Sequence, residues 1–412
     1  MITRHNIPIT SDDTTTPRVD APIMRGSHPL THDTHFTRND IPTPRRDTTI
    51  TRRGALLATL IPALARAQSG TEKLLSLYDF EAEARTRISH GAWERISGAA
   101  ADEITLRWNR EAYDRLRLNP RVLVDVSKIE TGIKLLGADL PFPIILAPTG
   151  GQGLILPEGD LLAANGAAAA HATYCISSSA SMPVEAIARR AGGAVWFQLY
   201  VQKDRGFTRE LVRRAEDAGC RALCVTVDSP NQGSRNREER AKGELPDRVL
   251  PNLQGKDYLD PTLTWKDIDW LRGFARRPVL LKGILNPDDA AIAVKAGVDG
   301  IIVSNHGARN LDTVPATIDA LPRIVERIER ERVERRVPVI VDGGIRRGTD
   351  IIKAIALGAT AVQVGRPYLW GLGVAGAPGV TRVVEILRKE LELAMALMGR
   401  PTLASIDHTA IW

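Results

Sequence analysis

The chain of 412 residues lacks the features that mark several common classes of protein. It has three cysteines, an odd number that is too small for a disulfide framework, and Cys220 and Cys224 have no second ligand pair to complete a zinc site. No apolar run reaches the roughly 18–20 residues of a membrane-spanning helix. The net charge of +6 comes from basic residues interleaved with acidic ones, unlike a nucleic-acid-binding surface. We therefore expect buried thiols, no metal site and no nucleic-acid partner.

Residues 1–70 differ in composition from the rest of the chain. They contain no lysine and no glutamate and are rich in threonine. Such a segment cannot bury enough apolar surface to offset the entropy of ordering, so we predict a disordered extension. Four of the eight histidines lie in it, and their irregular spacing favours incidental residues over a metal-binding tract: His5, His28, His32 and His35.

The end of this extension has the pattern of an export signal. Arg52 and Arg53 precede a mildly apolar run, Gly54–Ala65, and Ala65-Arg66-Ala67 has the small-x-small form of a cleavage site. Ala55 stands where twin-arginine signals usually have a large apolar residue, so a chance arginine pair in a basic linker is the other interpretation. We predict periplasmic export by the twin-arginine route, with a cytoplasmic protein as the alternative.

From about residue 72 the sequence alternates between short apolar runs and helical stretches. The runs are rich in Val, Ile and Leu without alternation, which indicates strands covered on both faces. Eight strand–helix repeats in about 250 residues predict an α/β fold, the (β/α)8 TIM barrel. A doubly wound sheet would open with a glycine-rich phosphate loop, and none follows the first strand. The predicted strands are Pro143–Ala147, Tyr174–Ser177, Val195–Leu199, Ala222–Val227, Val279–Lys282, Gly300–Ser304, Val337–Val341 and Ala361–Val364.

The helical stretches complete the expected domain of residues 71–412. We expect residues 72–130 to form a helical cap on the N-terminal side and residues 379–398 to form the closing helix. The clearest helical stretches between the strands are Leu161–His171, Arg209–Ala218, Asp288–Ala296, Ile318–Arg332 and Asp350–Leu357.

Polar residues follow all eight predicted strands, at the ends that form the working face of a TIM barrel. The glycines after the last two strands each have an arginine close behind, which indicates a phosphate site. Lys282 at a buried strand end needs an anionic partner, and an anionic reduced flavin would supply one. His306 beside Arg309 places a base next to a carboxylate-binding fork. Asp228 is a candidate to orient that imidazole.

These residues carry a resemblance to a known family. From Trp93 to about Trp412 the sequence resembles the FMN-dependent 2-hydroxy-acid oxidases and dehydrogenases, which include glycolate oxidase, lactate oxidase and mandelate dehydrogenase. The segment SNHGARNLD at 304–312 is close to the family signature. The runs LAPTG, FQLYV, VTVD, LLKG, VDGGIRRGTD and VGRP occur in family order and spacing.

The resemblance implies a role for each matching residue. It makes His306 the acceptor of the substrate's proton with Asp228 in support, and it gives Tyr200 a hydrogen bond to the substrate. Arg309 and Arg235 hold the substrate carboxylate. The electrons leave the α-carbon for the flavin as a hydride or through a carbanion, and both routes stay open. The residues that the resemblance assigns to FMN are Pro148, Thr149, Gly150, Ser177, Gln198, Thr226, Lys282, Ser304, Asp342, Gly343, Gly344, Arg346, Gly365 and Arg366.

Two positions depart from the family pattern. Glu94 stands where the family usually has a substrate-binding tyrosine, three residues before the turn Ser97-Gly98-Ala99. A carboxylate there repels a bound carboxylate unless it is protonated, points away or meets a cationic group of the substrate. Ser179 replaces a bulky aromatic of the glycolate oxidase-like members, which predicts a larger pocket. Oxidation of an amine-bearing or peptide-derived substrate is therefore the alternative. Retention of His306, Arg309 and Tyr200 favours a 2-hydroxy acid.

Further properties follow from the resemblance alone or stay open. It implies a homotetramer. The electron acceptor is oxygen, a quinone or a carrier protein, and the sequence does not choose among them or name the hydroxy acid and its stereochemistry. A flavoprotein without catalytic activity also stays open because of Glu94. A non-redox flavin isomerase is disfavoured, since it gives the base and arginine after the sixth strand no role.

Overall fold

A computed structural model of the protein describes residues 70–193, 195–253, 259–333 and 336–412. The extension predicted for residues 1–70 lies outside these ranges apart from Gly70, and so do its twin-arginine pair and its four histidines. The structural findings below concern the described residues.

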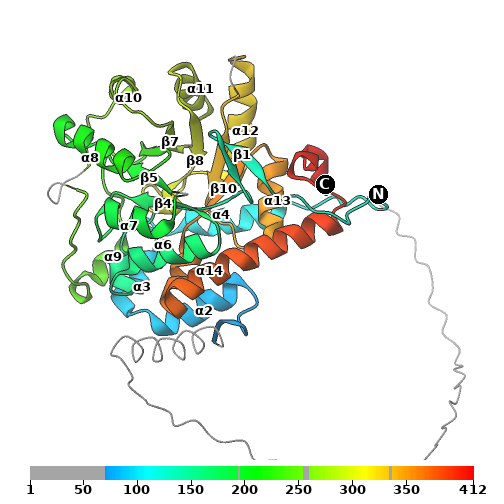
Figure 1. Ribbon diagram of the computed structural model, residues 1–412, viewed down its shortest axis with the longest axis horizontal. Coiled ribbons are helices and arrows are strands. Elements are labelled where there is room, and N and C mark those ends of the chain that lie inside the picture. Colours follow the sequence, from blue (N-terminus) through cyan, green and yellow to red (C-terminus); the bar gives the residue numbers. More distant parts are fainter. Residues whose placement is uncertain (1–69, 194, 254–258, 334–335) are drawn as a thin grey trace, which may run out of the picture. The chain divides into compact units, whose positions relative to one another are not determined.

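Eight parallel strands close into a barrel, in which each strand pairs with the next along the chain and β10 pairs with β3. Figure 1 shows the helices placed around these strands. The arrangement confirms the predicted (β/α)8 TIM barrel, and each predicted strand overlaps an observed one. The barrel strands are β3 (Ile144–Leu146), β4 (Thr173–Ser177), β5 (Val195–Leu199), β6 (Leu223–Thr226), β7 (Val279–Ile284), β8 (Gly300–Val303), β9 (Val339–Asp342) and β10 (Ala361–Val364).

The helices between the strands begin where the sequence supplies caps. Asp204 accepts a hydrogen bond from the Phe207 amide before α8, and Asn286 accepts one from the Asp288 amide before α11, which opens on Pro287. All five predicted inter-strand helices overlap observed ones. The helices after β3 are α5 (Gln152–Ile155), α6 (Gly159–Ala169), α7 (Val184–Ala191), α8 (Arg205–Asp217), α9 (Asn236–Arg240), α10 (Trp265–Arg272), α11 (Pro287–Lys295), α12 (Thr317–Arg330), α13 (Gly348–Ala356) and α14 (Arg366–Leu397), with 3-10 turns at Lys242–Glu244, His306–Ala308, Leu403–Ser405 and His408–Ala410.

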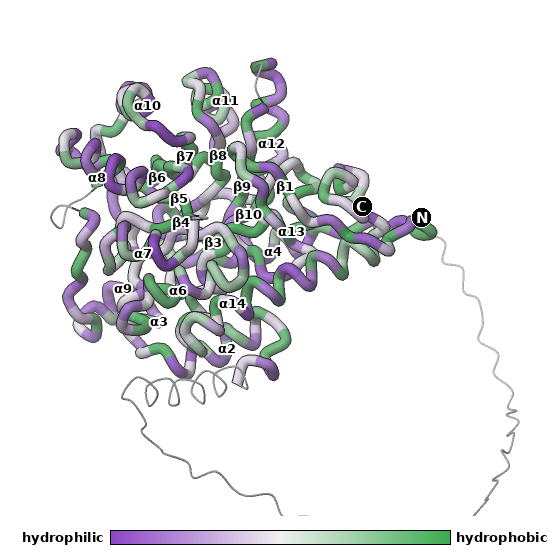
Figure 2. The backbone as a smooth tube through the Cα atoms, in the orientation of Figure 1, coloured by the Kyte–Doolittle hydropathy of each residue, from purple (hydrophilic) through white to green (hydrophobic). Residues whose placement is uncertain are grey.

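The strands bury both of their faces, as their unbroken apolar runs predict. Outward-facing residues such as Ile144 and Leu146 pack into one apolar cluster with the helices. Inward-facing residues, among them Ile145, Trp196 and Leu280, form a second cluster inside the barrel. Figure 2 draws the barrel strands largely in green, the colour of hydrophobic residues. The interior of the barrel is therefore packed where this inner cluster lies, and any cavity has to lie at one end of the barrel.

The expected helical cap needs two corrections. Helices α2 (Leu77–Arg87), α3 (His90–Ser97) and α4 (Ile104–Arg115) form, but no helix follows between Arg115 and the strand pair β1 (Ile133–Leu135) and β2 (Ala138–Leu140). That hairpin, not the helices, covers the N-terminal end of the barrel, because its apolar residues pack on the inner cluster. The helices lie at the opposite end, where Asn109 of α4 hydrogen-bonds Asn305 just after β8.

The closing helix is longer than predicted. Residues 379–397 belong to α14, which starts directly after β10 at Arg366. A break at Ala375 and Gly376 divides it, and Gly376 has a φ of +62°, a conformation that favours glycine. Within the described ranges no helix is both long and apolar enough to span a membrane. Cys175, Cys220 and Cys224 are buried, unbridged thiols.

Candidate active site

The polar residues of the site stand one layer above the apolar core of the barrel. Inward-facing positions recur every second residue of a strand, so the positions after the apolar layer also face inward. This register places Ser177, Gln198 and Thr226 in a row, with hydrogen bonds of 3.1 Å between Ser177 Oγ and Gln198 Oε1 and 2.9 Å between Gln198 Nε2 and Thr226 Oγ1. They line a cavity at the C-terminal end of the barrel that encloses about 1120 Å³, its open mouth included.

His306 and Asp228 form the pair that the sequence predicts. The imidazole Nδ1 lies 2.9 Å from Asp228 Oδ1, and Nε2 lies 3.4 Å from the Tyr200 hydroxyl. A carboxylate only accepts hydrogen bonds, so Nδ1 carries the proton and Nε2 keeps a lone pair. His306 and Tyr200 line the cavity, whereas Asp228 supports the imidazole from outside the lining. Gly283 permits this approach, because a Cβ there would collide with the Asp228 carboxyl group.

Burial and charge set the protonation of this pair. Burial lowers the pKa of His306 below its ordinary value of 6.5, and Lys282 adds to the shift while Asp228 opposes it. For Asp228, burial acts to raise the pKa, but the interactions with His306 and Lys282 outweigh burial and the pKa falls. A neutral imidazole beside an ionised carboxylate is the state that a general base requires.

Lys282 needs an anionic partner, as the sequence predicts, and the chain itself supplies one in Asp342. Its Nζ donates a 2.9 Å hydrogen bond to Ser304 Oγ and lies 3.4 Å from Asp342 Oδ2. Ser304 in turn donates to Asp342 over 2.8 Å. Burial acts to lower the pKa of Lys282, but Asp342 and Asp228 outweigh it and the pKa rises. Lys282 therefore stays charged. Ser304, which links it to Asp342, does not line the cavity.

Arg309 and Arg235 come together at the cavity, around a carboxylate that the sequence did not single out. Arg309 Nη2 lies 2.9 Å from Glu238 Oε2, and Arg235 Nη1 lies 3.7 Å from the same oxygen. Arg95 of α3 also forms an ion pair with Glu238. Arg309 Nη1 is fixed separately by the carbonyl oxygens of Arg95 and Gly98, at 2.6 and 2.8 Å. In this structure the carboxylate that the cluster binds is that of Glu238.

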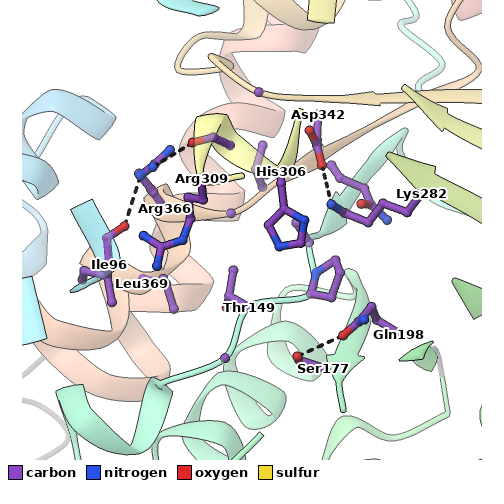
Figure 3. A pocket seen from close by; sticks show the side chains of 18 of the residues that line it. Ile96, Thr149, Ser177, Gln198, Lys282, His306, Arg309, Asp342, Arg366 and Leu369 are labelled. Carbon is purple, nitrogen blue, oxygen red and sulfur yellow. Dashed lines mark hydrogen bonds and ion pairs between the residues drawn. The ribbon is translucent and has the colours of Figure 1, made fainter. Parts of the chain in front are cut away.

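Arg346 and Arg366 lie at the cavity as expected for a phosphate site. Among the described residues, no carboxylate forms an ion pair with either guanidinium. Arg366 donates to the carbonyl oxygens of Ile96, Gly98 and Gly307, and Arg346 lies 4.7 Å over the Trp370 ring. Burial, with Arg309 and Arg346 nearby, lowers the pKa of Arg366 to about 9. Buried cations that form no ion pair with a described carboxylate indicate a site for an anion. Figure 3 shows Arg309 and Arg366 on one side of His306, and Lys282 and Asp342 on the other.

The remaining lining fits FMN. Gly343 and Gly344 have φ of +93° and +78°, and a Cβ on Gly344 would collide with the Asn109 backbone, so the chain can form this turn beside the arginines only with glycine. Asp342 Oδ1 and both amide atoms of Gln363 are buried at the cavity and have no hydrogen-bond partner among the described residues. Orphaned polar atoms at one end and buried cations at the other suit the hydroxyls and the phosphate of a flavin mononucleotide.

Pro148, Thr149, Gly150 and Gly365 also line the cavity, so Ser304 is the one residue assigned to FMN that does not. Sequence reasoning missed Gln363, Arg95, Arg248 and Glu238. Gln363 follows the every-second-residue rule along β10 and was detectable, because Ala361 two positions earlier faces the core. The other three come from the cap and from the segment after β6, and the strand pattern gives no sign of them.

Glu94 is not where the resemblance suggested. Its carboxylate pairs with Arg237, at 2.6 and 2.9 Å, and it does not line the cavity. The hydrogen bond from Arg237 lowers the pKa of Glu94, with burial opposing, so the group is ionised. Of the three possibilities for this residue, pointing away is the one observed. The cation that it meets belongs to the chain itself, which removes the observation that favoured an amine-bearing substrate.

Comparisons with known proteins identify the family of the chain. A family model described as FMN-dependent dehydrogenase matches residues 84–412. An L-lactate oxidase of Nostoc sp. is 43% identical over 81% of this chain and 96% of its own length. A peroxisomal (S)-2-hydroxy-acid oxidase of Oryza sativa subsp. japonica is 44% identical over 82% of this chain and 95% of its own. A mandelate oxidase solved with benzoyl-formic acid superposes with a TM-score of 0.77 at 39% identity, covering 82% of this chain and 98% of that one. The chain therefore belongs to the FMN-dependent dehydrogenase family.

Proposed function

We propose that this protein oxidises a 2-hydroxy acid to a 2-oxo acid with FMN. The observation that carries the proposal is one cavity in which a neutral, carboxylate-supported imidazole, a tyrosine hydroxyl and two arginines around a carboxylate stand beside an FMN-compatible lining. A 2-hydroxy acid supplies the matching groups, a carboxylate next to a hydroxyl-bearing carbon. The names of the relatives, which are oxidases of lactate, of (S)-2-hydroxy acids and of mandelate, support the same substrate class.

The side chains divide the work of the reaction. Arg309 and Arg235 bind the substrate carboxylate and fix the α-carbon, while Tyr200 hydrogen-bonds the substrate oxygen next to His306. His306 accepts the substrate's proton at Nε2, and the Asp228 carboxylate 2.9 Å from Nδ1 stabilises the imidazolium that forms. When bound, FMN would supply the acceptor for the two electrons and the second proton that the substrate loses. Arg346 and Arg366 would hold its phosphate, and Lys282 would keep a positive charge at the base of the site.

A direct test is incubation of the purified holoenzyme with paired L- and D-2-hydroxy acids in the presence of a dye acceptor. Formation of the matching 2-oxo acid from one enantiomer, with equimolar dye reduction, is expected. If amines are oxidised and every hydroxy acid is left intact, the substrate class is wrong.

The acid limb of the pH profile should lie below pH 6.5. The base works only when neutral, and the pKa of His306 is lowered below its ordinary value of 6.5, so kcat/KM at pH 6.5 should exceed half of its plateau and fall only at lower pH. Asp228→Asn removes an interaction that raises the pKa of His306, so its acid limb should move further down, with a lower plateau. A wild-type midpoint above 6.5 would contradict this assignment.

Glu94→Gln should affect folding more than catalysis. The substitution breaks a partly buried ion pair with Arg237 but leaves the cavity lining intact. We expect the free energy of unfolding to fall by about 1–2 kcal/mol, and kcat/KM to change by less than about threefold. Denaturant titration and steady-state kinetics of the same preparation measure the two effects. A gain in kcat/KM of about tenfold or more for small hydroxy acids would return Glu94 to the substrate pocket.

We also propose export, an acceptor and an assembly state. The Arg52-Arg53 pair, the apolar run and the cleavage pattern support twin-arginine export, and Arg52→Lys with Arg53→Lys should keep the protein in the cytoplasm upon cell fractionation.

The relatives named as oxidases favour oxygen over a quinone or a carrier protein, so oxygen uptake should match 2-oxo acid formation. Family resemblance supports a homotetramer, which light scattering on a sizing column measures directly.

A further inference from the structure

One carboxylate binds the arginines that the proposed function assigns to the substrate. Glu238 lies on the short helix α9, and its two carboxylate oxygens bind three guanidinium groups. Oε2 lies 2.9 Å from Nη2 of Arg309, which follows β8, and 3.7 Å from Nη1 of Arg235, which directly precedes α9. Oε1 pairs with Arg95 of α3. Glu238 thus joins the cap to the segments that follow two different strands of the barrel.

Glu238 stands behind these three arginines and not in the cavity itself. All three arginines line the cavity, whereas Glu238 does not, and the Glu238 side chain is only 12% exposed. The arrangement has the same form as that of His306, whose imidazole lines the cavity while Asp228 supports it from outside the lining. A carboxylate that enters the cavity therefore meets the guanidinium groups, and Glu238 can act on it only through them.

Three guanidinium groups need a negative charge to stay this close together. Like charges repel one another, and the repulsion is stronger for partly buried groups than for groups in water. It is felt beyond the cluster, because burial lowers the pKa of Arg366 and the charge of Arg309 lowers it further. Backbone contacts orient the arginines in part, as where Arg235 Nε donates a 3.2 Å hydrogen bond to the Arg309 carbonyl oxygen. The carboxylate of Glu238 binds all three groups and offsets their repulsion.

We propose that Glu238 is a positioning residue, which holds the three arginines in the arrangement that binds the substrate carboxylate. This inference rests on the proposed function and deepens it. The opposite result is expected if Glu238 acts by its charge alone, since removing a negative charge beside the site would strengthen the binding of an anion. The sign of the change in affinity therefore separates a positioning role from a purely electrostatic one.

The test measures the Kd of the holoenzyme for 2-oxobutanoate and for its neutral amide, 2-oxobutanamide, through the flavin absorbance. Wild type should bind the acid at least about tenfold more tightly than the amide. Glu238→Gln keeps the size of the side chain and loses its charge. It should raise the Kd of the acid by about 10- to 100-fold, because displaced guanidinium groups no longer meet the carboxylate, and change that of the amide by less than about threefold. Glu238→Asp keeps the charge and should restore part of the affinity.

Two control variants show whether the arginines or the whole of helix α9 are affected. Glu239→Gln changes the neighbouring glutamate, which is exposed and pairs with Lys242, and should leave both Kd values within about threefold of wild type. Glu94→Gln breaks the ion pair with Arg237, which also joins α3 to α9, and should have as little effect. If Glu94→Gln weakens binding of the acid as much as Glu238→Gln does, Glu238 serves only to dock the helix and the proposal is wrong.

Steady-state kinetics show whether Glu238 acts through Arg309. Glu238→Gln should lower kcat/KM for 2-hydroxybutanoate by about 10- to 100-fold, and the loss should divide between KM and kcat as it does in Arg309→Met. In the double variant the combined loss should be smaller than the two single losses together, because the substitutions affect one contact. Fully additive losses, tighter binding of the acid in Glu238→Gln, or equal wild-type affinity for acid and amide would overturn the proposal. The Kd values need no turnover, so they decide it even if no 2-hydroxy acid is oxidised.

Discussion

Replacing His306 by asparagine should leave FMN bound and the protein yellow, yet slow flavin reduction by a 2-hydroxy acid by about 10²- to 10⁴-fold. The imidazole Nε2 is the group placed to accept the proton, with Nδ1 committed to Asp228. Asparagine is preferred to alanine because the residue has a φ of +58°, a left-handed conformation that asparagine tolerates better than other non-glycine residues. Stopped-flow reduction under anaerobic conditions measures the step.

The control for this variant is its flavin content and unfolding midpoint, which should match the wild type because His306 contributes one face of a large lining. Asp228→Asn is the matched comparison, since it keeps the imidazole and weakens only its support. The rate of flavin reduction should fall less in Asp228→Asn than in His306→Asn. Flavin reduction at a wild-type rate in His306→Asn would remove this residue as the base.

Replacing Arg309 by methionine should lower kcat/KM for 2-hydroxy acids by about 30- to 3000-fold, the range that removal of one partner from a buried charge pair covers. Arg309 is held in place by the carbonyl oxygens of Arg95 and Gly98 and points its second nitrogen at a carboxylate. The loss should appear mainly in KM if the contact acts equally in the ground and transition states, and in kcat if it fixes the reacting carbon.

Arg309→Lys is the informative companion, because it keeps the charge and loses the two-pronged geometry. An intermediate activity is expected from it. The released Glu238 carboxylate keeps Arg95 as a partner, so the fold should survive either change. A kcat/KM within about threefold of wild type in Arg309→Met would show that the substrate carboxylate binds elsewhere.

The barrel and its polar layer were predictable because both follow from local periodicity. Unbroken apolar runs mark strands buried on two faces, and the every-second-residue rule carries Ser177, Gln198 and Thr226 to the cavity. The pairing of His306 with Asp228 followed from the position of both at strand ends. These inferences need only the register of each strand and the closure of the barrel.

The contacts that could not be predicted join segments far apart in the chain. Glu94 is offset by Arg237 and Glu238 by Arg309, and each pair links the cap or a strand end to the short helix α9. No strand register fixes that helix, so its charges could not be matched from spacing. The acidic partner of Lys282 was not predicted for a related reason, because Asp342 stands two strands away around the barrel.

Anaerobic reduction of the bound flavin by a series of 2-hydroxy acids tests the central claim most directly. Mixing the wild-type holoenzyme with the preferred enantiomer should bleach the oxidised-flavin absorbance and yield one 2-oxo acid per flavin, while His306→Asn under the same conditions stays yellow. Bleaching by amines alone, or the absence of bleaching by every 2-hydroxy acid in protein that carries its full complement of FMN, would contradict the proposed function.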